Sequence, residues 1–265
     1  MPALFITRFI NQHSVDGWEE AFSEMPANRF EALAFQTFIE GFRGLIRSRD
    51  AVDDVRNAYV WSRRDDPGVA VSNAQQMELF RATEAFFNDL YSAVSKLSGV
   101  VARNSAVFQT NFSDNGPFLR WLDDRYPQEH GRTAEVEKAR LFRAILAHPQ
   151  QFPPYDWATF VDRKKLTLVV LWGARGRGRN PIPKGATVSH ALAQGDWQFQ
   201  APDEASVTNA VGALAEEILL EMLLAYSKRR ALRRPLTSHE ARVALAPEVD
   251  VSDDQRRVNS RREGI

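Results

Sequence analysis

An arginine and a histidine at the end of one helix-forming segment are the residues best suited to chemistry in this chain. Four residues separate Arg143 from His148, and Pro149 follows at once. The two side chains leave a helix roughly 140° apart, so the long arginine must extend toward the helix end to meet the imidazole. A guanidinium binds two phosphate oxygens at any working pH, and an imidazole exchanges protons near neutrality. Together they predict a metal-free site for a phosphodiester.

The position of His148 favours a charged ring. A residue that precedes proline avoids the helical region, so we expect His148 at a frayed helix end, where carbonyls and the helix dipole stabilise a cation. Arginine and histidine also close many helices simply by bonding their last carbonyls. A purely structural role therefore stays open beside the chemical one.

Two predicted helices position this pair. The helix that carries it begins at Thr133, a capping residue, and ends before Pro149. The longer helix from Asn73 to about Val101 precedes it. Its apolar side chains recur at helical spacing and are predicted to face inward: Met77, Phe80, Phe87, Leu90, Tyr91, Val94 and Leu97.

The spacing from Arg143 to His148 at a helix end resembles the Arg-x4-6-His signature of the HEPN superfamily (higher eukaryotes and prokaryotes nucleotide-binding). The aromatic stretch from Ala85 to Val94 resembles the long helix that precedes this motif, and the similarity covers roughly residues 73–226. The resemblance implies an up-and-down helical bundle and a metal-independent ribonuclease that dimerises so that two motif helices line one cleft. A toxin or antiviral defence role, with a cognate inhibitor or partner protein, is implied in the same way.

By that resemblance, His148 exchanges protons at the 2′-hydroxyl or the leaving oxygen, and Arg143 stabilises charge on the scissile phosphate. A 2′,3′-cyclic phosphate is the implied product. Ala144 departs from the family pattern, in which Asn, Asp or His often follows the arginine. The alternative is a non-catalytic helical module that binds a partner or a nucleotide.

A basic, glycine-rich segment follows the apolar run Lys165–Trp172. Its glycine spacing is similar to a phosphate-binding loop, but Arg179 and Asn180 replace the lysine and the hydroxyl that such a loop needs, which argues against an ATPase. We predict instead that Arg175, Arg177 and Arg179 contact an RNA backbone, with a solvated hairpin tip as the alternative.

Other histidines are weaker candidates. Arg125 and His130 repeat the same separation, but Pro127 lies between them and predicts a loop. The remaining histidines lie far apart and without paired carboxylates, so we expect no metal site and no cofactor: His13, His190 and His239.

Composition limits the class of protein. The chain has 265 residues, and its 34 Lys plus Arg are balanced by 34 Asp plus Glu, so nucleic acid can be bound only at a local site. The chain has no cysteine, which excludes thiol chemistry. The apolar start from Met1 to Phe9 lacks the features of a signal peptide, and no run approaches a membrane span of about 20 residues. We expect a soluble, cytoplasmic protein.

The remaining elements complete a mainly α fold. Residues 29–49 form a predicted helix, and a second one runs from Asp203 or Ser206 to about residue 230. The apolar stripe of the first is predicted to face the core: Phe30, Leu33, Phe38, Phe42, Leu45 and Ile46. A short helical patch is predicted at 118–122 and a polar loop at 123–131. The run at 165–172 pairs with 186–192 in a small β-hairpin insertion. We expect an N-terminal helical segment at 1–72, the bundle at 73–235, and a polar, mobile tail at 236–265.

Overall fold

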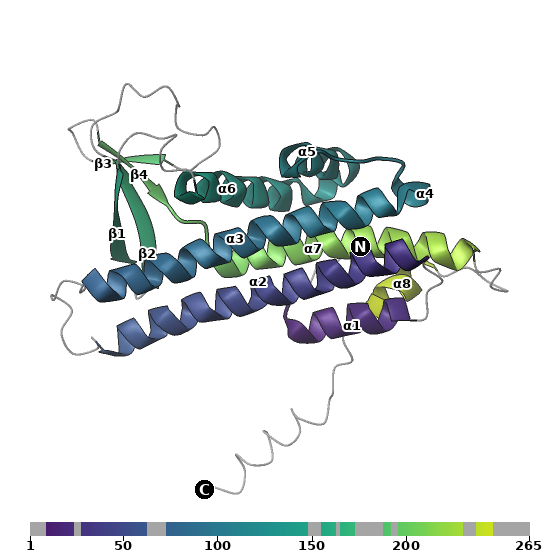
Figure 1. Cartoon of the computed structure of the whole chain (residues 1–265), viewed down its shortest axis with the longest axis horizontal. Helices are drawn as coiled ribbons and strands as arrows, with labels where there is room; N and C mark the ends of the chain where they lie inside the picture. The colour runs from purple at the N-terminus through teal and green to yellow at the C-terminus, as the bar shows by residue number, and fades with distance from the viewer. Residues whose placement is uncertain are drawn as a thin grey trace, which may run out of the picture.

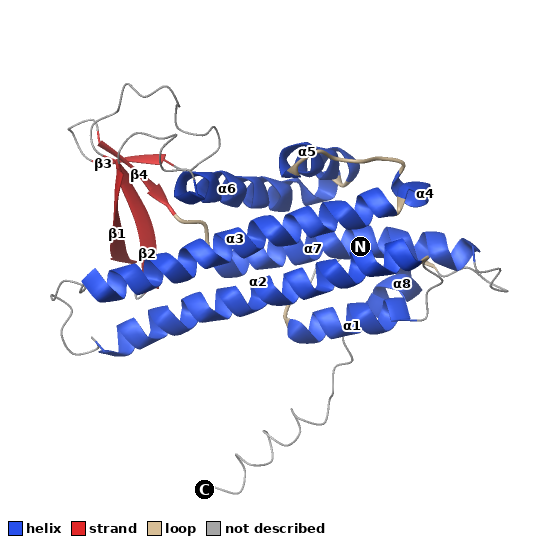
Figure 2. Cartoon of the chain, in the orientation of Figure 1, coloured by secondary structure: helices blue, strands red, loops and turns tan. Residues whose placement is uncertain are grey.

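The structure, a computed structural model of the chain, describes residues 9–23, 28–62, 73–147, 155–162, 165–172, 188–191, 196–229 and 237–245. Helices dominate it (Figure 2). They are α1 (Gln12–Ser23), α2 (Arg29–Ser62), α3 (Asn73–Arg103), α4 (Ser105–Phe108), α5 (Asn115–Arg125), the 3-10 turn η1 (Pro127–Glu129), α6 (His130–Ala147), α7 (Glu204–Arg229) and α8 (Ser238–Leu245). The strands are β1 (Tyr155–Asp162), β2 (Lys165–Trp172), β3 (Val188–Ala191) and β4 (Asp196–Gln200).

The helices form a bundle around one long antiparallel pair. Helices α2 and α3 pack against each other along their length, and α7 contacts both of them (Figure 1). Helices α5 and α6 pack on α3, whereas α1 packs on α2 and α8 packs on α1 and α7. This arrangement confirms the prediction of a mainly α helical bundle.

Aromatic side chains fill the core. Phe87 of α3 and Phe142 of α6 have ring centroids 4.9 Å apart, and the rings of Trp18 and Phe42 join α1 to α2 at 5.4 Å. Each large apolar side chain removed from water stabilises the fold by about 1.5–3 kcal/mol. Four predicted apolar positions lie on the surface instead: Phe30, Leu33, Met77 and Tyr91.

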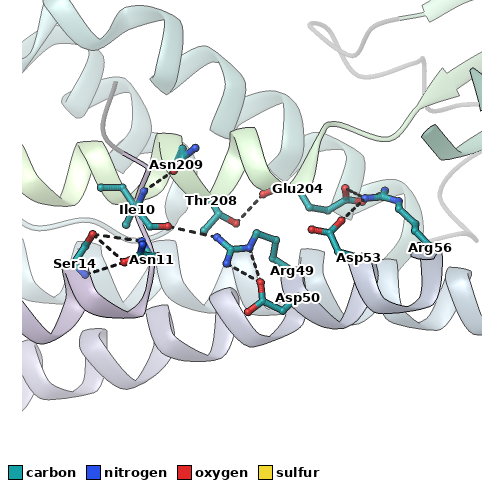
Figure 3. Close-up of polar contacts among 10 residues, drawn as sticks. All are labelled: Ile10, Asn11, Ser14, Arg49, Asp50, Asp53, Arg56, Glu204, Thr208 and Asn209. Atoms are coloured by element: carbon teal, nitrogen blue, oxygen red, sulfur yellow. Dashed lines mark hydrogen bonds and ion pairs between the residues drawn. The ribbon is translucent and has the colours of Figure 1, made fainter. Parts of the chain in front are cut away.

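Polar contacts attach the segment before α1 and the start of α7 to the bundle (Figure 3). The Ile10 amide donates to Asn209 Oδ1 at 2.8 Å, and Arg49 Nη1 donates to the Ile10 carbonyl at 3.4 Å. Gly212 makes room for this segment, because a Cβ there would lie 2.6 Å from Ile10 Cγ2. The apolar Ile10 side chain is consequently buried against α7.

Side-chain caps begin α2, α7 and α8. Asp203 Oδ2 accepts the Ser206 amide at 2.9 Å, so of the two predicted starts of α7 it is Asp203 that caps the helix. Asn28 and Glu31 accept each other's backbone amides before α2. Thr237 and Glu240 do the same before α8, which lies within the predicted polar tail. The tail from residue 246 onward lies outside the described residues.

The strands form a four-stranded sheet in the order β1-β2-β4-β3, with each neighbouring pair antiparallel. It lies at one end of the bundle, where β2 contacts α2 and α3 (Figure 1). The hairpin predicted between 165–172 and 186–192 is not shown. Strand β4 lies between β2 and β3, and β2 pairs instead with β1 and β4. The reason is that 155–162 and 196–200 also extend and take both edges of β2.

Candidate functional site

Arg143 lies on α6 at the face that meets α3. Its neighbour Phe142 is buried against Phe87, so the packing of these two rings sets the rotation of α6 on α3. The Arg143 guanidinium carbon lies 4.7 Å from the centroid of the Tyr91 ring, and Nε donates to Asn88 Oδ1 at 3.1 Å. A stacking contact and a hydrogen bond from one helix thus hold a cationic side chain of the other.

The terminal nitrogens of Arg143 make no hydrogen bond to the part of the chain that the structure describes. Within the described residues, the hydrogen bond of Arg143 is made by Nε, and neither Nη1 nor Nη2 has a partner. These two nitrogens carry four N–H donors in one plane, which is the geometry that binds two oxygens of a phosphate. Since the side chain is already oriented, binding such an anion costs less conformational entropy than it would from a mobile arginine.

Helix α5 supports the tyrosine from behind. Asn115 Nδ2 donates to the Tyr91 carbonyl at 3.0 Å, and Asp114 caps α5 by accepting the Gly116 amide at 2.6 Å. The site therefore lies where α3, α5 and α6 meet. The buried side-chain amide of Asn115, at the N-terminus of α5, holds the backbone of α3 at Tyr91.

Arg140, one turn before Arg143, already has a carboxylate partner. Its Nε and Nη2 donate to Glu137 at 2.6 and 2.8 Å. The hydrogen bond with Glu137 is the main reason that the pKa of Arg140 is raised, and Asp114 adds a smaller attraction. Arg143 is thus the less constrained cation of the two, and the one suited to an external anion.

The described part of α6 ends at Ala147, so His148 and Pro149 lie outside the described residues. Arg175, Arg177 and Arg179 lie outside them too. The structure therefore brings Arg143 to Asn88 and Tyr91, and the predicted meeting of Arg143 with His148 stays a prediction. The apolar repeat predicted that Tyr91 lies in the core, and Asn88 was not among the predicted site residues. The three-residue spacing of Asn88 and Tyr91 nevertheless places them on one helix face.

The second Arg–His pair has a different structure from the one predicted. Helix α5 continues to Arg125, Pro127 begins the 3-10 turn η1, and α6 begins at His130, so the predicted polar loop at 123–131 is mostly helical. Proline is compatible with a first helical position, where its missing N–H is not needed. Thr133 lies inside α6 rather than at its cap, and its hydroxyl donates to the Glu129 carbonyl.

The charged groups of that region pair separately. Arg125 binds Glu221 on α7, with Nε at 3.0 Å, and Tyr126 donates its hydroxyl to the same carboxylate at 2.8 Å. His130 Nδ1 lies 2.7 Å from Asp123 Oδ1. Burial is the main reason that the pKa of the Tyr126 phenol is raised, and the hydrogen bond to Glu221 adds to it. These pairs join α5, α6 and α7, and Arg125 has little freedom to bind a substrate.

No group of three or more acidic or histidine side chains that could hold a metal ion is present in the described ranges. Among the helices that the structure describes, none has the length and apolar character needed to cross a bilayer. Comparison of the chain with family models, with curated proteins and with solved structures finds no match. The contacts of Arg143 with Tyr91 and Asn88 are therefore the observations from which a function is inferred.

Proposed function

We propose that the chain is a metal-independent ribonuclease of the HEPN type, with Arg143 and His148 as its catalytic residues. The observation that carries the proposal is the orientation of Arg143. Tyr91 stacks on its guanidinium and Asn88 binds its Nε, while Nη1 and Nη2 have no hydrogen-bond partner in the described part of the chain. An arginine held in this way binds the scissile phosphate of RNA through two parallel hydrogen bonds.

The proposed reaction needs only a base, an acid and a cation. His148 takes the proton of the 2′-hydroxyl, the 2′-oxygen bonds to phosphorus, and the bond to the 5′-oxygen breaks as that oxygen takes a proton from water; the imidazolium then returns its proton to solvent. The products are a 2′,3′-cyclic phosphate and a 5′-hydroxyl. Arg143 stabilises the charge that develops on the non-bridging oxygens.

The finer parts of the proposal follow from the family resemblance. Two copies of the chain pair so that the α6 ends face each other, and the basic segment after β2 adds phosphate contacts through Arg175, Arg177 and Arg179. The setting is a toxin or defence effector held in check by a cognate inhibitor. These basic contacts make RNA binding weaken as salt concentration rises.

The test is RNA cleavage in EDTA by the wild-type chain and single variants. Arg143→Ala and His148→Ala are each expected to lower the cleavage rate by about 100-fold or more. Arg132→Ala is the matched control on the same helix. Arg132 pairs with Glu129 and lies about three helical turns before Arg143, which is the residue that contacts Asn88 and Tyr91. Cleavage that survives both substitutions, or that requires a divalent ion, would contradict the proposal.

Two observations favour a second candidate, a non-catalytic helical interaction module. The Arg143 contacts to Tyr91 and Asn88 join α6 to α3, and such contacts stabilise a bundle whether or not RNA binds. Ala144 also lacks the polar group of the family pattern. This candidate predicts no RNA turnover by the wild-type chain, together with a loss of stability of about 0.5–1 kcal/mol in Arg143→Ala.

A further inference from the structure

A shallow apolar groove lies between the first turns of α2 and the last turns of α3, away from Arg143. It has a volume of about 230 Å³. Helix α2 lines it with Phe30, Leu33 and Thr37, which recur every three to four residues and thus share one face. Helix α3 lines it with Lys96, Gly99 and Arg103, at the same kind of spacing. The groove therefore lies between one row of side chains on α2 and one row on α3, and it extends for about two helical turns, roughly 10 Å.

The apolar side chains of this groove are exposed. Phe30 is 66% exposed and Leu33 is 58% exposed, the highest values among the large hydrophobic residues that the structure describes. Phe35, Phe38 and Phe42 on the inner face of the same helix are buried. The first turns of α2 thus carry two neighbouring apolar side chains that the described residues leave exposed. Exposed apolar side chains bordered by charged residues, as these are by Lys96 and Arg103, mark a candidate interaction site.

The shape of the groove fits a helix. Gly99 has open space where a Cβ would lie, so the floor on the α3 side is low. The stem of Lys96 lies across α2 at Gly41, where a Cβ would come within 2.6 Å of its Cδ, and it forms one end of the groove. Two packed helices with a low floor between them accept a third helix, whose side chains at positions i, i+3, i+4 and i+7 enter the groove.

The charge of the groove indicates the chemistry of its partner. Both charged residues that line it, Lys96 and Arg103, are cations, and the Arg103 guanidinium lies over the Phe30 ring at 5.9 Å. A second copy bound through the same groove would bring these cations against their own counterparts, which is unfavourable. We infer that the groove binds an amphipathic helix of a partner protein whose apolar face is bordered by aspartates or glutamates. This inference does not depend on the proposed nuclease activity.

The probe is a labelled synthetic helix of about 14 residues, with leucines at i, i+3, i+4 and i+7 and glutamates at most other positions; a second probe replaces every glutamate by lysine. Fluorescence anisotropy with the full chain is expected to show at least about tenfold tighter binding of the glutamate peptide. Lys96→Glu with Arg103→Glu is expected to reverse that preference.

Two glycine variants separate the groove from the rest of the surface. Gly99→Leu fills the floor and is expected to weaken binding of the glutamate peptide by at least about tenfold. Gly131→Leu is the matched control, because Gly131 is also helical and open but lies on α6. Circular dichroism checks that both variants fold. The inference would be overturned if the two peptides bound equally well, or if the two glycine variants had equal effects. It would also be overturned if the chain formed a dimer that Gly99→Leu abolishes and bound no peptide.

Discussion

Arg56 on α2 and Glu204 in the first turn of α7 form an ion pair that is closed to solvent. Arg56 Nη2 donates to Glu204 Oε1 at 2.7 Å, Nη1 lies 2.7 Å from Oε2, and the carboxylate side chain is 1% exposed (Figure 3). Asp53 Oδ1 lies 3.3 Å from Arg56 Nη1, but its side chain is 50% exposed, so Glu204→Gln leaves the buried guanidinium with only this more solvated carboxylate as a counter-charge. We expect the free energy of unfolding, measured by urea denaturation, to fall by about 1.5–3 kcal/mol.

The double variant Arg56→Met with Glu204→Leu is the control for that prediction. Because it removes both charges and keeps their volume, it is expected to recover most of the lost stability. A Glu204→Gln variant as stable as the wild type, or a double variant less stable than Glu204→Gln, would contradict a buried ion pair.

The contact between Tyr91 and Arg143 gives a second prediction, which rests on the proposed ribonuclease function. Tyr91→Ala removes the ring that orients the guanidinium, so cleavage is expected to slow by about tenfold, whereas Tyr91→Phe retains the stacking face and most of the rate. Steady-state cleavage of a short RNA measures both. Tyr91 acts here as a positioning residue, and a rate that falls equally in the two variants would instead indicate a role for its hydroxyl.

The buried phenol of Tyr126 predicts a loss of stability in alkali. Burial and Glu221 raise its pKa above the ordinary tyrosine value of about 10. The folded chain then keeps a proton that the unfolded chain releases, so this contribution is complete below about pH 10 and is lost as the pH rises beyond it. The urea midpoint of the wild type is expected to decrease between about pH 9 and 11 more steeply than that of Tyr126→Phe. Parallel curves would show that the phenol is not the cause.

Two helical glycines are expected to respond to alanine in opposite directions. A Cβ at Gly212 would lie within 2.6–2.9 Å of three side-chain atoms of buried Ile10, so Gly212→Ala should destabilise the fold by about 1–3 kcal/mol. A Cβ at Gly44 on α2 would have nothing within 4 Å, so Gly44→Ala should stabilise the fold by about 0.5–1 kcal/mol. Thermal melts of the two variants compare them directly; a stabilised Gly212→Ala chain would show that Ile10 is not packed there.

Local signals were enough to predict α3 and the start of α7. The apolar repeat from Asn73 predicted α3 to about Val101, and the helix ends at Arg103; Asp203 was one of two predicted caps of α7 and is the residue that caps it. Helix α2 was predicted to residue 49 and runs to Ser62, because its apolar repeat weakens where the buried Arg56 replaces an apolar residue. The residue pair Thr237 and Glu240 is typical of a helix start, and it could have predicted α8. The segment was instead predicted to be a mobile tail because it has few apolar residues.

The candidate site was less predictable. Periodicity identifies an apolar face but not what covers it, which is why Tyr91, Phe30 and Leu33 were expected in the core and lie on the surface. The pairing of Arg143 with Asn88 depends on how α6 crosses α3, a tertiary relationship that no spacing within either segment contains. The same holds for β4, whose place between β2 and β3 depends on pairing between distant segments.

The order of the helices along the chain also bears on how the bundle folds. Helices α2 and α3 are neighbours in sequence and pack along their whole length, whereas the contact of α2 with α7 joins residues 148 positions apart. Local contacts close short loops and form early, so we expect the α2–α3 hairpin to form first and α7 to dock onto it afterward. Loss of the Glu204 carboxylate should then leave the refolding rate nearly constant and make unfolding faster.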